Sequence, residues 1–595
     1  MFKIKNSVIL LNAVLLSACT SNGGSFDTNS VKASPSHSSS SKDSATQPKS
    51  ERRTISSAEG SAQPSLGFQT KIPRRNFFGG TGEENGAIGE ITPIVGEPGK
   101  PLSLEEEMKK LEEEVKKLGY DEDDIIHTHD GKKLHRKREM KFVRSGYFIH
   151  LGASAERSKR EEPRLLKTGP TGYVYYLGTQ PSKAFPTEIA TYKGTWDFTT
   201  NASAKNNSKY FEGSNAGTNV GATSEDNQAN TDDKDKPIGH SSEFTVNFSE
   251  KTLKGTLTKN GYVNPREKDK QEITDHYKIE ANIHGNRFNG KAKALKTDDP
   301  YFGKDSNTVE GGFYGDKAQE LAGKFLADDK SIFVVFAGKR DEKSEDKVEK
   351  KFDSVQVSLK DLAKSDMDTF GLATHLVIDG VQIALLPEEK TRFADMDFYQ
   401  VLTKNINSKD YKISVCCNNL DYVKFGTFEQ DSQDNKDGHQ YLVGERTAVA
   451  DLPKEARIYR YTGTWDGIIR SKNGGVGGDS PSDKAHGTRS IFDVNFADKK
   501  IEGKLIANDG LETNPMLTLD GKIERNGFSG TAKTGEKGFN IDNKSTAGGT
   551  VVHLNAKFEG GFYGPQAAEL GGIVHSAETT ETNKDKVSIT FGGKR

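Results

Sequence analysis

The chain has 595 residues, which is enough for several domains of ordinary size. Its 84 basic residues are balanced by 86 acidic ones, and this argues against a nucleic-acid-binding protein, because such proteins normally carry a basic excess. Three cysteines are too few for a scaffold held together by disulfides.

Residues 1–18 have the pattern of an export signal. Lys3 and Lys5 supply the basic start, and the apolar stretch over 8–16 is too short to span a membrane as a helix. Leu-Ser-Ala-Cys at 16–19 resembles a bacterial lipobox, in which cleavage precedes the cysteine and its thiol is acylated. We therefore expect lipidation of Cys19, with no following aspartate to retain the lipoprotein at the inner membrane. The alternative is an ordinary signal peptide followed by a chance cysteine.

Residues 19–65 are predicted to form a disordered anchor peptide behind that lipid. The segment consists mainly of Ser, Lys, Asn, Gln and Thr, with almost no large apolar side chain. Such a composition buries too little surface to offset the entropy of ordering the chain. A tether of this kind suggests that the folded part reaches outward toward a large partner.

A helix is predicted over residues 103–119. Ser103 can cap it, and one face carries an apolar stripe formed by Leu104, Met108, Leu111, Val115 and Leu118. Four glutamate–lysine pairs are spaced i,i+4 along the polar face. The heptad spacing leaves a coiled coil open, but two heptads are few, and packing of the stripe on the chain's own domain is favoured.

The basic stretch at 132–144 and its neighbouring histidines are expected to be a solvated loop. His127, His129 and His135 lie close in sequence, yet no carboxylate or cysteine set accompanies them at the spacing of metal ligands. No metal site is predicted.

Most of the remaining chain is a duplication. The stretch from Val309 to Gly323, with its Glu-Gly-Gly-Phe-Tyr-Gly motif, recurs from Phe558 to Gly572, and four further segments repeat in the same order. The offsets lie far above the roughly 20 to 50 residues of a solenoid repeat, so whole domains are duplicated. The protein is predicted to have two homologous lobes.

The two repeated regions, 191–340 and 456–595, are predicted to be antiparallel β-barrels of eight strands. Apolar and polar residues alternate in segments such as 244–248 and 492–496, which is typical of half-buried strands. A less regular domain precedes each barrel, at 66–190 and 352–455, and a charged linker joins the lobes at 341–351. The fold class is therefore mainly β, with two homologous lobes that each pair a smaller domain with a barrel.

Aromatic residues at equivalent positions of the two copies are expected to maintain the fold. Trp196 and Trp465, the two tryptophans of the chain, are predicted to plug the barrel cores. The duplicated pairs Phe313–Tyr314 and Phe562–Tyr563 are assigned to fold maintenance for the same reason.

No enzyme is predicted. The phosphate-binding, zinc-protease and serine-hydrolase motifs are absent, and the acidic stretch at 431–438 lacks the final glutamate of a calcium loop. The adjacent Cys416 and Cys417 lack redox spacing, so either a strained disulfide between neighbours or two buried thiols is expected.

The lipobox, the polar anchor, the two lobes, the doubled Gly-Gly-Phe-Tyr-Gly motif with its trailing Ala-x-Glu-Leu, and the closing Gly-Lys-Arg together resemble the transferrin-binding protein B family. This resemblance extends from Cys19 to Arg595. It implies that each lobe pairs a handle domain with an eight-stranded barrel. It further implies an outer-membrane surface lipoprotein of a Gram-negative bacterium that captures the host's iron-loaded transferrin and passes it to transferrin-binding protein A, a TonB-dependent receptor. The family holds no iron or other cofactor of its own.

The resemblance also implies that the first handle makes the main transferrin contact. Exposed aromatic side chains flanked by loops are the expected anchors of such an interface. The candidates are Phe77, Phe78 and Phe185, followed by Tyr147, Tyr173, Tyr175 and Tyr176. Two alternatives stay open: a surface lipoprotein for another host protein, such as haemoglobin or a complement regulator, and a lipocalin-like carrier of a small ligand.

Overall fold

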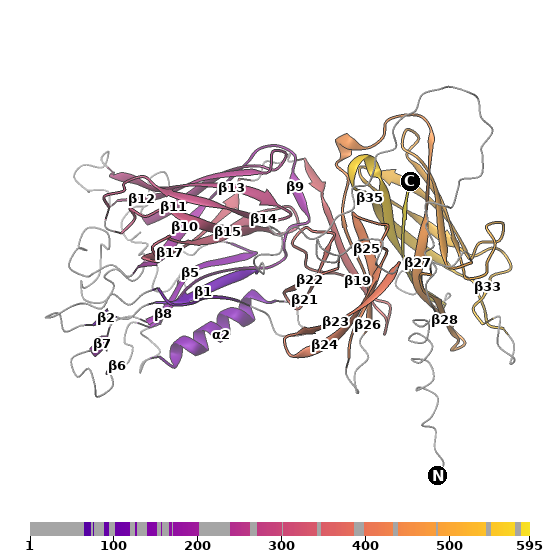
Figure 1. Cartoon of the computed structure of the whole chain (residues 1–595), viewed down its shortest axis with the longest axis horizontal. Coiled ribbons are helices and arrows are strands. Elements are labelled where there is room, and N and C mark those ends of the chain that lie inside the picture. Colours follow the sequence, from indigo (N-terminus) through magenta and orange to yellow (C-terminus); the bar gives the residue numbers. More distant parts are fainter. Residues whose placement is uncertain are drawn as a thin grey trace, which may run out of the picture.

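A computed structural model describes most of the chain beyond the anchor peptide (Figure 1). The described residues are 65–72, 75–76, 88–94, 102–118, 125–127, 140–150, 156–157, 166–168, 171–200, 239–261, 271–299, 301–341, 347–385, 398–431, 438–482, 486–542, 549–576 and 585–595. The predicted signal peptide, Cys19 and residues 20–64 of the predicted anchor peptide lie outside them, as do His129 and His135. Ser65, predicted to end the anchor peptide, is buried and donates its hydroxyl to the carbonyl of Gly67 at 2.8 Å.

The first lobe combines a handle sheet with a closed barrel. The handle sheet has the order β3-β1-β8-β5-β4 and the barrel runs β10 to β17 in sequence order. The handle elements are β1 (Gly67–Lys71), β3 (Ile91–Pro93), α2 (Leu104–Lys116), β4 (Ile125–His127), β5 (Val143–His150) and β8 (Thr171–Gly178), with a small sheet of β2 (Arg75–Asn76), β6 (Glu156–Arg157) and β7 (Leu166–Thr168). The barrel strands are β10 (Ala190–Thr200), β11 (Gly239–Asn247), β12 (Thr252–Asn260), β13 (Ile273–His284), β14 (Arg287–Ala294), β15 (Ser306–Tyr314), β16 (Glu320–Leu326) and β17 (Ile332–Arg340).

The second lobe repeats this plan beside the first (Figure 1). Its handle sheet has the order β20-β19-β26-β25-β24-β23, formed by β19 (Phe352–Ser358), β20 (Lys364–Asp366), β23 (Tyr399–Ile406), β24 (Lys409–Cys416), β25 (Val423–Gln430) and β26 (Gly438–Glu445), with a hairpin of β21 (His375–Ile378) and β22 (Val381–Ala384). Its barrel is closed by pairing of β27 with β37 and contains β27 (Ile458–Arg470), β29 (Arg489–Asn495), β30 (Lys500–Ile506), β31 (Leu517–Glu524), β32 (Gly527–Lys533), β35 (Asn555–Tyr563), β36 (Glu569–His575) and β37 (Lys586–Lys594). Smaller elements are β28 (Val476–Asp479), β33 (Phe539–Asn540), β34 (Val551–Val552) and the 3-10 turns η6 (Val449–Asp451) and η7 (Pro565–Ala567).

The predicted fold class is confirmed: the chain is mainly β, with two antiparallel eight-stranded barrels and a handle domain in each lobe. The closing registers are equivalent, because Trp196 lies opposite Phe336 in the first barrel and Trp465 opposite Phe591 in the second. Closure matters because it leaves neither barrel with an unpaired edge strand.

Both barrel interiors are filled with side chains. Trp196 and Trp465 are fully buried, as predicted, and each indole N–H donates to a carbonyl across the barrel, that of Thr258 at 3.0 Å and that of Ile506 at 2.9 Å. An eight-stranded barrel is just wide enough to be filled in this way. Side chains pack the core of each barrel among the described residues. A lipocalin-like carrier of a small ligand would instead need a hollow barrel.

The predicted helix is α2, and Ser103 caps it by accepting the backbone N–H of Glu106. Leu111 and Val115 are buried, so the apolar stripe packs on the handle sheet and not on a second helix. Of the predicted i,i+4 pairs, Glu112–Lys116 forms at 3.3 Å. The structure adds an i,i+3 pair between Glu107 and Lys110 at 2.7 Å.

The repeated glutamate of the Ala-x-Glu-Leu motif fastens each handle to its barrel. Glu320, which is 1% exposed, accepts the backbone N–H groups of Lys141 at 2.6 Å and Phe142 at 2.8 Å. Glu569, fully buried, accepts those of Asp421 and Tyr422 at 2.6 and 2.8 Å. The same motif therefore performs the same docking in both lobes.

The adjacent cysteines form a disulfide, which settles the alternative left open by the sequence. Cys416 and Cys417 are joined across a cis peptide bond and are buried in the core of the second handle. No helix among the described residues combines the length and apolar character needed to cross a membrane.

We predict that Glu320→Gln loosens the first handle. The carboxamide retains one acceptor oxygen but turns an N–H donor toward a backbone amide, and a lost charge-assisted hydrogen bond costs about 2 kcal/mol. Hydrogen exchange of the amides at 141 and 142 should accelerate by more than about tenfold. The control Glu280→Gln changes an exposed side chain of β13 and should leave this exchange unchanged. Equal exchange in the wild type and Glu320→Gln would contradict the role given to Glu320.

We also predict acid sensitivity of the first barrel. Burial lowers the pKa of His276 to about 4, against the opposing charge of Asp299. Because the unfolded state binds a proton near pH 6.5 and the folded state does not, stability is full above that pH and falls by about 3 kcal/mol on going to pH 4.

His276→Phe should flatten this dependence, because its ring can stay against Phe302, which lies 4.3 Å from the imidazole centroid. Fluorescence of Trp196 in a Trp465→Phe background reports on the first barrel alone during denaturation. His284→Phe, at an exposed position of the same strand, is the control. An equally steep pH profile in His276→Phe would contradict this assignment.

Candidate partner-binding surfaces

The candidate tyrosines lie on β5 and β8 of the first handle and point to alternate faces of the sheet. Tyr147 and Tyr176 face the barrel and share one core with Tyr314 and Phe333. Tyr175 is buried on the opposite face against α2 and donates its hydroxyl to the sulfur of Met108 at 3.1 Å. Alternation correctly places these residues on strands, but both faces of the sheet are covered, one by the barrel and one by the helix.

Tyr176 ties the handle to the barrel through a buried arginine. Arg287 donates to the hydroxyl of Tyr314 at 2.9 Å and to that of Tyr176 at 3.3 Å, and Tyr314 in turn donates to the carbonyl of Leu66 at 3.0 Å. Burial raises the pKa of Tyr176, so its hydroxyl stays neutral and available to the guanidinium. Tyr176 therefore lies between the handle sheet and the barrel and helps to hold the two together.

Tyr173 is the partly exposed member of the tyrosine set. It packs at the edge of the cluster formed by α2 and the sheet. Burial raises the pKa of Tyr173, and the nearby carboxylate of Glu114 adds to the shift. Its ring therefore lies at the boundary between the handle core and solvent, where an interface anchor can be reached.

The expectation that Phe185 is exposed is wrong: it is 3% exposed. It lies on β9 (Ala184–Pro186), which pairs with β18 (Val348–Lys350) at the end of the predicted linker between the lobes. Its ring is 4.9 Å from that of Phe248 in the first barrel and 5.9 Å from that of Phe352 in the second handle. A loop flanked by prolines suggested exposure, but the segment is the strand that joins the lobes.

The repeat contained a signal for this burial. Phe-Pro at 185–186 precedes the first barrel, and Leu-Pro at 452–453 precedes the second, where Leu452 packs against the barrel core. The segment therefore has a second-lobe counterpart, unlike a lobe-specific binding loop. Phe77 and Phe78 lie outside the residues that the structure describes.

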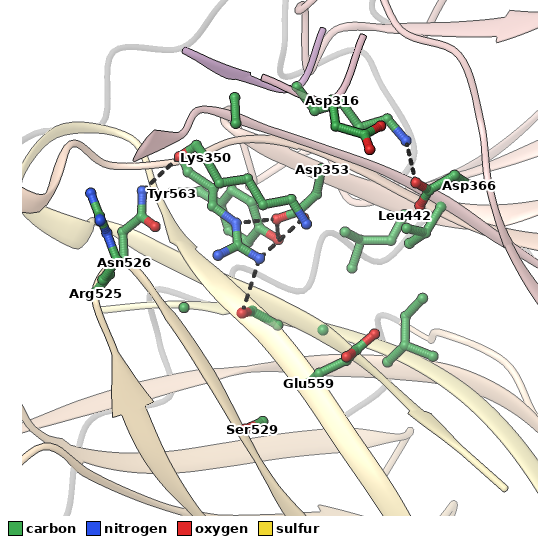
Figure 2. Close-up of a pocket in the computed structure, with 18 of the residues that line it drawn as sticks. Asp316, Lys350, Asp353, Asp366, Leu442, Arg525, Asn526, Ser529, Glu559 and Tyr563 are labelled. Atoms are coloured by element: carbon green, nitrogen blue, oxygen red, sulfur yellow. Dashed lines mark hydrogen bonds and ion pairs between the residues drawn. The ribbon is translucent and has the colours of Figure 1, made fainter. Parts of the chain in front are cut away.

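A cleft of about 1210 Å³, lined by several charged side chains, lies between the lobes (Figure 2). Its walls include Asp316 of the first barrel and Arg525 of the second, and its floor contains the ion pair of Arg446 with Asp353 at 2.6 Å. Burial alone would raise the pKa of Asp353, but Arg446 and Lys350 together hold it well below its usual range. The pair is therefore ionised, and it supplies binding groups and no general acid.

Among the described residues, no group of three or more histidine, cysteine, aspartate and glutamate side chains is arranged to hold an ion. The two candidate binding surfaces are the partly exposed ring of Tyr173 on the first handle and the cleft with charged side chains between the lobes.

Comparison with protein families identifies all four domains. A model of the N-lobe handle of Tf-binding protein B matches residues 40–182, and a model of its C-lobe handle domain matches 349–447. A model of the C-lobe and N-lobe β-barrels of the same protein matches 185–340 and 452–595. The chain belongs to the transferrin-binding protein B family. Its members are binding proteins and not enzymes.

Relatives of this family match along the whole chain. A transferrin-binding protein B of Neisseria meningitidis serogroup B is 36% identical over all of this chain and 98% of its own length. One from Moraxella catarrhalis is 36% identical over 83% of this chain and 74% of its own length. The crystal structure of the isotype 1 protein from serogroup B Neisseria meningitidis superimposes with a TM-score of 0.70 at 35% identity, over 89% of this chain and 99% of that one. A double mutant of the Haemophilus parasuis protein, described as a vaccine antigen, gives 0.70 at 30% identity over 92% and 98%.

We predict that Phe185→Ala destabilises the lobe junction. Removal of a buried phenyl ring typically costs about 3–5 kcal/mol, whereas an exposed substitution changes stability by less than about 0.5 kcal/mol. Ile189→Ala, at a side chain that is 62% exposed four residues further on, is the matched control. The unfolding free energy in urea should separate the two variants clearly. Equal unfolding free energies for Phe185→Ala and Ile189→Ala would contradict the burial of Phe185 in the lobe junction.

Proposed function

We propose that this chain binds host transferrin, preferentially in its iron-loaded form, at the surface of a Gram-negative bacterium. The observation that carries the proposal is the match of all four domains to transferrin-binding protein B, with a relative 36% identical over the full chain. The first handle is the proposed contact. Phe77, Phe78 and Tyr173 are its candidate anchors, while contact by Tyr147, Tyr175, Tyr176 or Phe185 would require their cores to open.

Selection of the iron-loaded form needs only that the handle contacts one conformer better than the other. The buried arginine–tyrosine link and the Glu320 clamp hold the handle on its barrel before any partner arrives. A pre-organised surface loses less conformational entropy on binding. This rigidity supports recognition of a partner's shape, as discrimination between two forms of one protein requires.

The proposal extends to the membrane and to a second protein. Cys19, through its lipidated thiol, would anchor the chain in the outer membrane, facing outward, and the anchor peptide would let the lobes reach the partner. Captured transferrin would pass to transferrin-binding protein A, the TonB-dependent receptor, for removal of iron.

Cys19→Ser should release the protein from the cell surface, and deletion of the receptor should stop iron uptake while leaving transferrin capture intact.

We predict saturable binding to the iron-loaded transferrin of at least one mammal, with weaker binding to its iron-free form, in surface plasmon resonance on residues 60–595. Tyr173→Ala should weaken this binding by roughly five- to thirtyfold, the usual cost of removing an aromatic anchor. Ile458→Ala, at a side chain 67% exposed on the second barrel, should not change it. No binding across a broad panel of transferrins would contradict the proposal.

A further inference from the structure

A short segment of the second handle packs into the core of the first lobe. Phe370 and Val377 of this segment are 3% and 5% exposed. Both belong to the apolar core that contains Tyr176 of the first handle and Tyr314 of the first barrel. Val377 lies on the hairpin of β21 and β22, which is located between the first handle and the large sheet of the second (Figure 1). Side chains of the second lobe therefore complete the core beneath the first handle.

The backbones of the two lobes approach each other closely at a pair of glycines. Gly285, in the turn between β13 and β14, and Gly371 of the second handle are both left-handed, with φ of 62° and 80°. A Cβ on Gly285 would lie 2.0 Å from the carbonyl oxygen of Phe370. A Cβ on Gly371 would lie 2.5 Å from the Cα of Gly285. A side chain at either position would therefore force the two backbones apart.

Two consecutive residues of the first barrel bind this segment of the second handle. Asn286 donates its side-chain amide to the carbonyl of Thr369 at 2.6 Å and its backbone N–H to the carbonyl of Phe370 at 3.3 Å. The guanidinium carbon of Arg287 lies 5.7 Å from the centre of the Phe370 ring, which is within the range of a cation–π interaction. The first barrel therefore binds both the backbone and the aromatic ring of the segment.

The same arginine also binds the first handle. Arg287 donates to the hydroxyl of Tyr176 on β8 at 3.3 Å and to that of Tyr314 at 2.9 Å. Burial raises the pKa of both tyrosines, so their hydroxyls stay neutral. Because a charge removed from water is costly without its partners, the position of the guanidinium depends on the tyrosines and on the ring of Phe370 together. One side chain of the first barrel thus contacts both handles.

The equivalent turn of the second barrel, between β31 and β32, has different partners. It places Arg525 where the first barrel has Gly285. The side-chain amide of Asn526 donates to the carbonyls of Lys350 and Thr447, at 2.8 and 2.9 Å. These two acceptors lie in the segments that enter and leave the second handle. The turn of the first barrel therefore joins the two lobes, whereas that of the second barrel binds segments next to its own handle.

We propose that the second lobe controls how firmly the first handle is held on its barrel, through a relay from Phe370 through Arg287 to Tyr176. Movement of Phe370 removes one contact of the guanidinium and weakens its hold on Tyr176, so that the first handle opens more often. Coupling of this kind is reciprocal. A partner that shifts or clamps the second handle would therefore change the first handle without touching it. The relay operates in the chain alone, so its test is separate from that of transferrin binding.

Hydrogen exchange of the chain spanning residues 20–595, followed by mass spectrometry, measures the opening of the first handle. Phe370→Ala should accelerate exchange in β1 and β8 by at least about fivefold, because the frequency of local opening sets the exchange rate. Exchange in β30 of the second barrel should not change, which separates this effect from loss of the whole fold. Unchanged exchange in β1 and β8 would overturn the proposal.

Val377→Ala and Ile383→Ala supply a matched pair, since both side chains are 5% exposed on the same hairpin. Val377 packs in the core beneath the first handle, whereas Ile383 packs in the core of the second handle. Val377→Ala should accelerate exchange in β1 and β8 by at least about threefold, and Ile383→Ala should have the smaller effect although it removes a larger side chain. An effect of Ile383→Ala that equals or exceeds that of Val377→Ala would also overturn the proposal.

The reverse direction tests the relay itself. Tyr176→Phe keeps the ring and removes the hydroxyl to which Arg287 donates. Exchange of the Asn286 amide, which donates to the carbonyl of Phe370, should then accelerate by at least about threefold. Tyr175→Phe is the control, because the hydroxyl of this neighbouring buried tyrosine is directed to α2 on the opposite face of the sheet. Equal exchange of the Asn286 amide in the two variants would show that no relay passes through Arg287.

Discussion

The architecture depends on how a small handle sheet is held on the outside of a closed barrel. The part of the first barrel beneath its handle is apolar and includes Phe333 and Val335. In each lobe the repeated glutamate, Glu320 or Glu569, provides a buried carboxylate that accepts two or more backbone N–H groups of the handle. Burial raises the pKa of Glu320, and the N–H groups of the handle oppose that shift. Without the docked handle, the buried carboxylate would lose these hydrogen-bond donors, at a cost in folding free energy. Handle and barrel are therefore one structural unit.

A second constraint distinguishes the lobes. Each places one buried guanidinium against the tyrosine of the Phe-Tyr-Gly motif, yet Arg287 belongs to the barrel and Arg446 to the segment that leaves the handle. Neutral tyrosine hydroxyls hold the first, and a carboxylate that stays ionised holds the second. The two lobes therefore place a guanidinium group at the same position, but the arginine comes from a different segment in each lobe and has a different binding partner. Phe370 of the second handle packs against Arg287, whereas Arg446 lines the cleft between the lobes.

Much of this fold could be predicted from the sequence because local signals and the repeat agreed. Alternating apolar and polar residues at 244–248 predict a barrel strand. The capping residue Ser103 and the apolar stripe that follows it predict a helix, which the structure confirms as α2. Trp196 and Trp465 were correctly assigned to the cores because a rare residue at equivalent places signals packing. The surfaces were predicted less well. Alternation cannot show that Tyr147 and Tyr175 are covered on opposite faces by a barrel and a helix, and proline flanks cannot show that Phe185 joins two lobes. These are tertiary facts, fixed by segments distant in sequence.

The central claim is that the first handle, held rigidly on its barrel, is where the chain meets transferrin. Hydrogen exchange of the chain with and without iron-loaded transferrin tests this most directly, because it reports on every backbone segment at once. The account predicts added protection in the first handle, around α2 and β8, and unchanged exchange across the second barrel. Protection confined to the second lobe, or none at all, would contradict it.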